Sequence, residues 1–242
     1  PRVFVYRSTD ATGTVDAVNK WVTTVAGTGS TPVIEALDEL SVINLEGAAD
    51  ADGSAINSRA LFGIPIASPA TTHVWKKLTL EFILQVVVTA RHGDTSFYGF
   101  TPAATGTRLT NNVIGIWPNS GGWDYTVDKA GTEETGGTSG THNTSKMKVK
   151  IVVRNGVVEF HINDSLSNTV TNTAVHPLVR QTVQFAQIET GAGGAATNIS
   201  QVRCWYEAHR ETWWQRCGRR YPNALADNFM LGLINEVARI QR

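Results

Sequence analysis

Paired carboxylates on one strand face are the first chemistry to look for, because retaining glycoside cleavage needs an acid and a nucleophile about 5 Å apart. Residues i and i+2 of a strand share a face. Glu81 and Glu159 lie in strand-like segments, and neither has a carboxylate two residues before or after it. Glu133 and Glu134 are adjacent and would point to opposite faces. We therefore expect no catalytic residues, and glycoside hydrolysis is the least favoured alternative.

Metal-ligand patterns are also missing. The six histidines are scattered without metal-ligand spacing, and no pair of cysteines stands near them. We expect no metal site, and we expect His161 to lie on the surface.

Aromatic residues around one predicted hairpin provide a binding hypothesis. Trp117, Trp123 and Tyr125 cluster there, and exposed aromatic rings could stack on sugar rings. The alternative is that Trp117 or Trp123 belongs to the hydrophobic core. These three residues are the glycan-binding candidates.

A second aromatic cluster, near the C-terminus, is mixed with arginines. It contains Trp213, Trp214 and Arg216, and an amphipathic helix is predicted after Asn223. Basic and aromatic residues together can bind single-stranded nucleic acid, but protein interfaces are enriched in the same residues, so we favour protein docking. The helix could pack on its own domain or on a neighbouring subunit. The subunit-docking candidates are Trp213, Trp214, Arg216, Leu225, Phe229, Leu233 and Val237.

The clearest structural element is a β-hairpin over residues 146–166. Apolar residues alternate with lysines before Asn155-Gly156, a dipeptide typical of a two-residue turn. With that turn, apolar residues face each other on one side of the ribbon. The expected pairs are Val153 with Val158, Ile151 with Phe160, and Val149 with Ile162.

Strand signals recur along the chain at the spacing of a sandwich. Further strands are expected at residues 78–88, 96–100, 112–117, 123–128, 182–190 and 198–206. Residues 131–144 are rich in Gly and Thr and predict an exposed, mobile loop. In the first 75 residues, strands are expected at 3–7 and 42–45, and the spacing of Val15, Val18 and Trp21 is helical.

Composition excludes several classes of protein. The formal net charge is zero, which gives no general attraction to nucleic acid or membrane, although residues 1–202 carry −3 and residues 203–242 carry +3. No apolar run approaches the roughly 20 residues of a membrane span, and no signal peptide is recognisable, so we expect no export by the usual route. Cys204 and Cys217 are either reduced thiols or a single disulfide.

The span from about Leu78 to Tyr206 resembles the concanavalin A-like, laminin-G-like jelly-roll family. The matching segments are the long strand from Leu80 followed by Phe97-Tyr98-Gly99-Phe100, the hairpin 147–163, and the closing strands 185–206. Asp164 departs from the family pattern, which often has Gly there. The resemblance implies a fold rather than an activity.

Calcium sites in lectin-like relatives use Asp and Asn oxygens. Five residues could provide such ligands, although nothing in their spacing favours a site, and we expect no cofactor. They are Asp94, Asp124, Asp128, Asn119 and Asn163.

The sequence thus predicts a mainly β protein, an antiparallel β-sandwich of jelly-roll type at residues 76–209. An N-terminal extension spans residues 1–75, and a basic, aromatic segment with a C-terminal amphipathic helix spans 210–242. Versions of the fold with few catalytic residues and long ends resemble modules of bacteriophage particles. We therefore expect a non-enzymatic virion structural protein, made in the host cytoplasm, that decorates a capsid or attaches to a tail. Its partners would be other virion proteins or further copies of itself. The alternative is a carbohydrate-binding module for attachment to cell-surface glycans.

Overall fold

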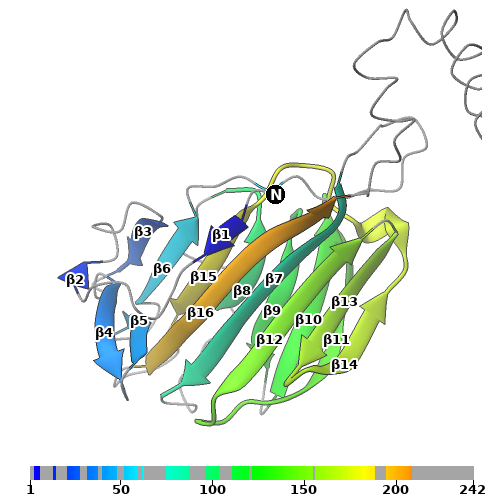
Figure 1. The fold of residues 1–242 in the computed structure, drawn as a ribbon. Helices are drawn as coiled ribbons and strands as arrows, with labels where there is room; N and C mark the ends of the chain where they lie inside the picture. Colours follow the sequence, from blue (N-terminus) through cyan, green and yellow to red (C-terminus); the bar gives the residue numbers. More distant parts are fainter. Residues whose placement is uncertain are drawn as a thin grey trace, which may run out of the picture. The chain divides into compact units, whose positions relative to one another are not determined.

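The computed structural model divides into two compact units, residues 1–207 and 208–242. It describes residues 3–5, 13–14, 21–27, 32–37, 40–47, 52–58, 62, 75–87, 96–103, 111–119, 122–154, 156–188 and 195–208. These residues form two antiparallel sheets, which lie as two layers (Figure 1). The predicted β-sandwich is confirmed.

The first sheet contains nine strands within the described residues. Their order is β14 (Ser165–Val170), β13 (Val157–Ile162), β12 (Met147–Arg154), β7 (Trp75–Val86), β16 (Ala195–Ala208), β5 (Leu40–Gly47), β4 (Val33–Leu37) and β2 (Gly13–Thr14), with β1 (Val3–Val5) also paired to β16.

The second sheet contains seven strands over the same described ranges. Their order is β11 (Thr132–Thr141), β10 (Gly122–Lys129), β9 (Ile114–Asn119), β8 (Phe97–Thr101), β15 (Thr182–Ile188), β6 (Gly53–Ser58) and β3 (Trp21–Ala26). A 3₁₀ turn, η2 (Thr173–Val175), precedes β15. No helix in the described part of the chain has the length and apolar character needed to span a membrane.

The β12–β13 hairpin has the predicted register. Val149 lies opposite Ile162, Ile151 opposite Phe160, and Val153 opposite Val158. Gly156 has a φ of 72°, as a two-residue turn requires, and Asn155 lies outside the described residues. The next turn lies at Asn163 and Asp164, which have φ values of 48° and 67°.

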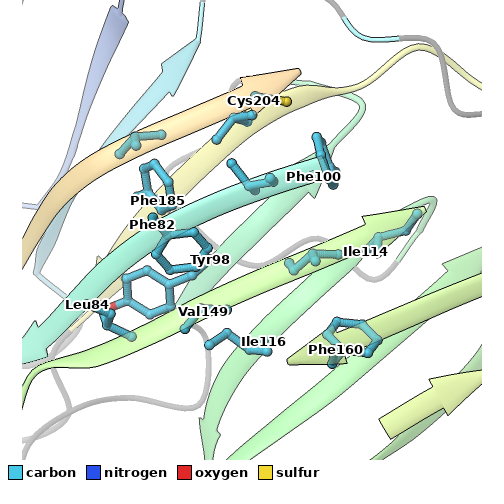
Figure 2. Close-up of a cluster of buried hydrophobic side chains, with 14 of the residues drawn as sticks. Phe82, Leu84, Tyr98, Phe100, Ile114, Ile116, Val149, Phe160, Phe185 and Cys204 are labelled. Atoms are coloured by element: carbon cyan, nitrogen blue, oxygen red, sulfur yellow. The ribbon is translucent and has the colours of Figure 1, made fainter. Parts of the chain in front are cut away.

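Side chains from both sheets fill the space between the layers (Figure 2). Strand β7 contributes an even-numbered apolar face, and Phe82 from this face meets Phe185 of β15 at a centroid distance of 4.8 Å. Tyr98 of β8 is fully buried, and its hydroxyl donates to Thr197 Oγ1 of the opposite sheet at 3.2 Å. The sandwich is therefore held by large apolar contacts and by a buried hydrogen bond between its layers.

Two local predictions are wrong. Residues 132–141 form strand β11 rather than a loop, because their backbone pairs with β10 through the tight turn Ala130-Gly131, and an edge strand can expose its side chains. The helical spacing around Trp21 is also misleading, since Trp21–Ala26 is strand β3, paired with β6. The N-terminal segment contributes strands to both sheets, an arrangement that the sequence left open.

The outer face of the seven-stranded sheet is accessible mainly at one end. All residues of β6, β8 and β15 are buried, on both faces of the sheet. Exposed and half-buried residues instead occur on β9, β10 and β11. The accessible outer surface of this sheet therefore lies on these three strands.

Candidate functional site

Trp117 lies on the outer face of the seven-stranded sheet. Ile114 and Ile116 of the same strand are fully buried in the core between the sheets, so alternation places Trp117 on the opposite face. The side chain is half-buried, and its indole nitrogen is covered. Part of an aromatic ring is thus available at the surface.

Polar groups surround Trp117 on the same face. Asp124 of β10 lies directly opposite Trp117, and Gly137 of β11 lies opposite Asp124 on the other side. Asn119 Nδ2 donates to Asp124 Oδ2 at 2.7 Å. Thr135 is exposed nearby and lies opposite Thr126. We call Trp117, Asn119, Asp124, Thr135 and Gly137 the Trp117 patch.

Gly137 keeps the Asp124 carboxylate accessible. A Cβ atom at position 137 would lie 3.8 Å from Asp124 Oδ1, at ordinary contact distance. Any larger side chain there would extend over the oxygen that Asn119 does not bind. The patch therefore combines an aromatic surface, a carboxylate and an amide, which are groups suited to the apolar faces and hydroxyls of a sugar.

Trp123 is not available to a ligand. It is 2% exposed, and its ring packs edge-to-face on Tyr98 at 5.6 Å and on His142 at 5.2 Å. Burial lowers the pKa of His142. Of the two alternatives that the sequence left open, the core position is correct for Trp123, and it is removed from the glycan-binding candidates.

Tyr125 also points between the sheets, although it is only half-buried. Its ring lies 5.2 Å from that of Phe160. Burial, and then the negative charges of Glu134 and Asp124, raise the pKa of Tyr125. Because Tyr125 faces away from Trp117, the three predicted aromatic residues do not form one platform.

The outer face of the nine-stranded sheet carries a different chemistry. Ion pairs cover β7, β12, β13 and β16 there, and we call this surface the basic face. Its charged residues are Lys77, Glu81, Lys148, Lys150, Arg154, Glu159, Arg203 and Glu207.

Glu81 and Glu159, the carboxylates considered for catalysis, are both held by cations on this face. Arg203 Nη2 lies 2.7 Å and Lys148 Nζ 3.5 Å from Glu81. Glu159 pairs with Arg154 and lies 3.4 Å from His161 Nε2. Partial burial raises the pKa of Glu159, but the hydrogen bond and charge of Arg154, together with His161, lower it more, and the net shift is downward. A general acid needs the opposite shift.

Of the conceivable calcium ligands, Asn119 and Asp124 contact each other through the amide nitrogen of Asn119, whereas Asp128 and Asn163 have other partners. Asp128 is buried, and its Oδ1 accepts from the backbone nitrogens of Asn112 at 2.6 Å and Gly131 at 3.2 Å. Asn163 lies in a turn of the other sheet, where its Oδ1 accepts from the backbone nitrogen of Lys148. Across the described ranges, no group of three His, Cys, Asp or Glu residues is placed to hold a metal ion. Asp94 lies outside them.

The remaining predicted residues are placed only in part. Cys204 is a free thiol buried in the core, and burial raises its pKa. Cys217 lies outside the described residues. So do all the subunit-docking candidates, namely Trp213, Trp214, Arg216, Leu225, Phe229, Leu233 and Val237.

Sequence reasoning missed most of the polar part of the Trp117 patch. Asp124 and Asn119 were considered only as calcium ligands, although the register of a short hairpin could have placed Asp124 opposite Trp117. Gly137 and Thr135 were missed because their strand was interpreted as a loop. An exposed edge strand has no alternation of apolar and polar residues, so its sequence contains no signal for a strand.

Comparison with known proteins supports the fold. No protein-family model matches the sequence, and no curated protein matches it. Among solved structures, the binding domain of botulinum neurotoxin DC in complex with SialylT has a TM-score of 0.50 and 10% identity, over 78% of this chain and 44% of that one. The same domain in complex with rat synaptotagmin II has a TM-score of 0.52 and 10% identity, over 85% and 48%.

A family 7 alginate lyase, A1-II′, in complex with its product has a TM-score of 0.53 and 10% identity, over 79% of this chain and 96% of that one. The chain therefore spans less than half the length of the neurotoxin domains but nearly all of the lyase. The fold is an antiparallel β-sandwich of the lectin-like, jelly-roll kind. At 10% identity the likeness concerns the fold alone, because one sandwich can host both binding and catalysis.

Proposed function

We propose that this chain is a non-catalytic carbohydrate-binding module whose ligand stacks on Trp117. The observation that carries the proposal is the position of Trp117, half-buried on the outer face and directly opposite the Asp124 carboxylate. Sugar recognition uses this pairing of an aromatic ring for the apolar face with polar groups for the hydroxyls. Solved neighbours of the same fold include a neurotoxin binding domain in complex with SialylT, which is consistent with the proposal.

The size of the patch suits one or two sugar rings. Trp117, Asp124 and Gly137 occupy neighbouring strands in one row, and two strand spacings amount to about 10 Å. Asn119 donates a hydrogen bond to one Asp124 oxygen and so orients the carboxylate, while the second oxygen lies beside Gly137. A preorganised acceptor of this kind binds a hydroxyl without a large entropy cost.

Trp117→Ala tests the proposal, with Trp205→Ala as its matched control. Trp205 is a half-buried tryptophan of β16 on the opposite sheet. A glycan array identifies a ligand, and titration then compares its affinity for the two variants. We expect Trp117→Ala to weaken binding about tenfold, which corresponds to loss of one aromatic stacking contact, and to leave the melting transition in place. An array without any ligand, or equal losses in both variants, would contradict the proposal.

Glycoside hydrolysis is not proposed, because Glu81 and Glu159 are each paired with a cation and neither has a second carboxylate two residues away on its strand face. Turnover of a polysaccharide that disappears in Glu81→Gln or Glu159→Gln would overturn this choice.

The bacteriophage setting stays a prediction from the sequence. It depends on residues 210–242, which lie outside the described residues. Deleting them should leave a folded β-sandwich that no longer assembles with its partner proteins. A truncated protein that assembles at full occupancy would contradict it.

A further inference from the structure

The three strands around the Trp117 patch are acidic. Strands β9, β10 and β11 contain four carboxylates and one basic residue, Lys129. Asp124, Asp128 and Glu133 share the outer face, since Asp128 lies opposite Glu133 and both alternate with core-facing residues. Lys129 lies two residues after the core-facing Val127 and therefore on the same face of the strand, not on the outer face with the three acids. The outer surface here thus has a negative potential.

Asp124 differs from the acids of the basic face in its partners. Glu81, Glu159 and Glu207 each pair with a lysine or arginine. Asp124 receives one hydrogen bond, from the neutral amide of Asn119, and no cation pairs with it among the residues described. A half-buried carboxylate beside an aromatic ring is therefore left with an uncompensated charge.

We infer that the Trp117 patch selects sugars that bear a protonated amine, an inference that rests on the proposed carbohydrate-binding function. An ammonium group between Trp117 and Asp124 would make two favourable interactions. It neutralises the carboxylate, and it lies near the indole, the best side chain for cation–π attraction. A carboxylated sugar in the same position is repelled by Asp124. The solved neighbours do not suggest this preference, and it comes from the charges of this chain alone.

The test compares three oligosaccharides of equal length with the full chain. The probes are a glucosamine tetramer, its N-acetylated counterpart and an oligo-alginate, titrated at a pH where the amine is protonated. We expect the glucosamine tetramer to bind about three- to tenfold more tightly than the N-acetylated one, the range of one exposed ion pair with one cation–π contact. The preference should shrink as salt is added, and the oligo-alginate should bind most weakly.

Asp124→Asn removes the charge at nearly constant shape and should abolish the preference for the amine, because the affinity for the glucosamine tetramer should fall further than the affinity for the N-acetylated tetramer until the two are equal. Asp124→Ser is a second variant without the charge, and it should abolish the preference in the same way if Asp124→Asn does not fold. Lys150→Gln, on the basic face, is the matched control and should change nothing.

The outcomes separate this inference from the proposed function. If Trp117→Ala weakens all three sugars but the intact protein shows no preference for the amine, the charge argument is wrong and the carbohydrate-binding proposal stands. If the preference survives in Asp124→Asn, or if a lysine-rich peptide binds as tightly as the glucosamine tetramer, the inference is also overturned. If no sugar binds and Trp117→Ala has no effect, both fail.

Discussion

The substitution Gly99→Ala tests the close approach of β8 and β9 in the centre of the seven-stranded sheet. A Cβ atom at Gly99 would lie 2.3 Å from the carbonyl oxygen of Ile114 and 2.5 Å from the Cα atom of Gly115. Both atoms belong to the backbone, so no side chain can rotate away, and the strands must separate. Overpacking of this kind costs about 2 to 3 kcal/mol of unfolding free energy.

Gly137→Ala is the matched control for this substitution. It lies in the same sheet, has no positive φ, and its Cβ atom would meet only Asp124 Oδ1, at 3.8 Å. The added methyl group has room, and alanine reduces the entropy of the unfolded chain, so the effect should fall between zero and a gain of about 1 kcal/mol.

Urea denaturation and thermal melting measure both effects. For a chain of 242 residues, Gly99→Ala should lower the melting temperature by about 4 to 12 °C and shift the urea midpoint without changing the slope. If Gly99→Ala and Gly137→Ala melt together, β8 and β9 do not approach as closely as described. A changed urea slope would mean instead that the alanine altered the native or the denatured ensemble.

Three further predictions concern the core and two titrating groups. Phe160→Ala should destabilise the protein by about 3 to 5 kcal/mol in urea unfolding, whereas Leu166→Ala, at a side chain 57% exposed, should change stability by less than about 0.5 kcal/mol. The pKa of Glu159 is lowered in the native state, so its contribution to stability is complete above the unfolded pKa of about 4.3 and is lost as the pH falls through the native value. Glu159→Gln should flatten the fall in melting temperature over that acidic range, and an unchanged profile would contradict the Arg154 pairing. Burial lowers the pKa of His176, with a hydrogen bond to the Val170 backbone opposing the shift. The unfolded chain therefore binds the proton first, and stability should decline as the pH falls below about 6.5. His176→Gln should remove that decline, as measured by melting curves between neutral and mildly acidic pH.

The part of the fold that was predictable from the sequence is the part with apolar alternation. The β12–β13 register follows from matching Val149, Ile151 and Val153 to apolar partners, because a slip of one residue would expose all of them. Strand β7 was recognisable for the same reason, since Leu78 to Val86 alternate over a long stretch. In both cases the core selects one register.

The part that was not predictable depends on backbone pairing and on distant partners. Most residues of strand β11 are exposed, so its Gly- and Thr-rich sequence has no apolar alternation from which a strand could be predicted. Strands β15 and β16 follow each other in sequence but lie in different sheets, and no local pattern specifies such a crossover. The Trp117 patch was therefore predictable only in part, because it combines a recognisable hairpin with one edge strand that was not recognised.

The placement of charges decides what this sandwich can bind more than its topology does. A neurotoxin binding domain and an alginate lyase resemble the fold of this chain with similar TM-scores, so the same β-sandwich occurs in a binding domain and in an enzyme. The chemistry that distinguishes such proteins must therefore lie in the side chains on the outer faces. In this chain the two faces differ. On one sheet Glu81 pairs with Arg203 and Lys148, and Glu159 pairs with Arg154. On the other sheet, no cation among the described residues pairs with Asp124, which lies opposite Trp117, so a positively charged ligand would compensate this carboxylate. We therefore place the proposed binding surface at Asp124 rather than at the paired carboxylates.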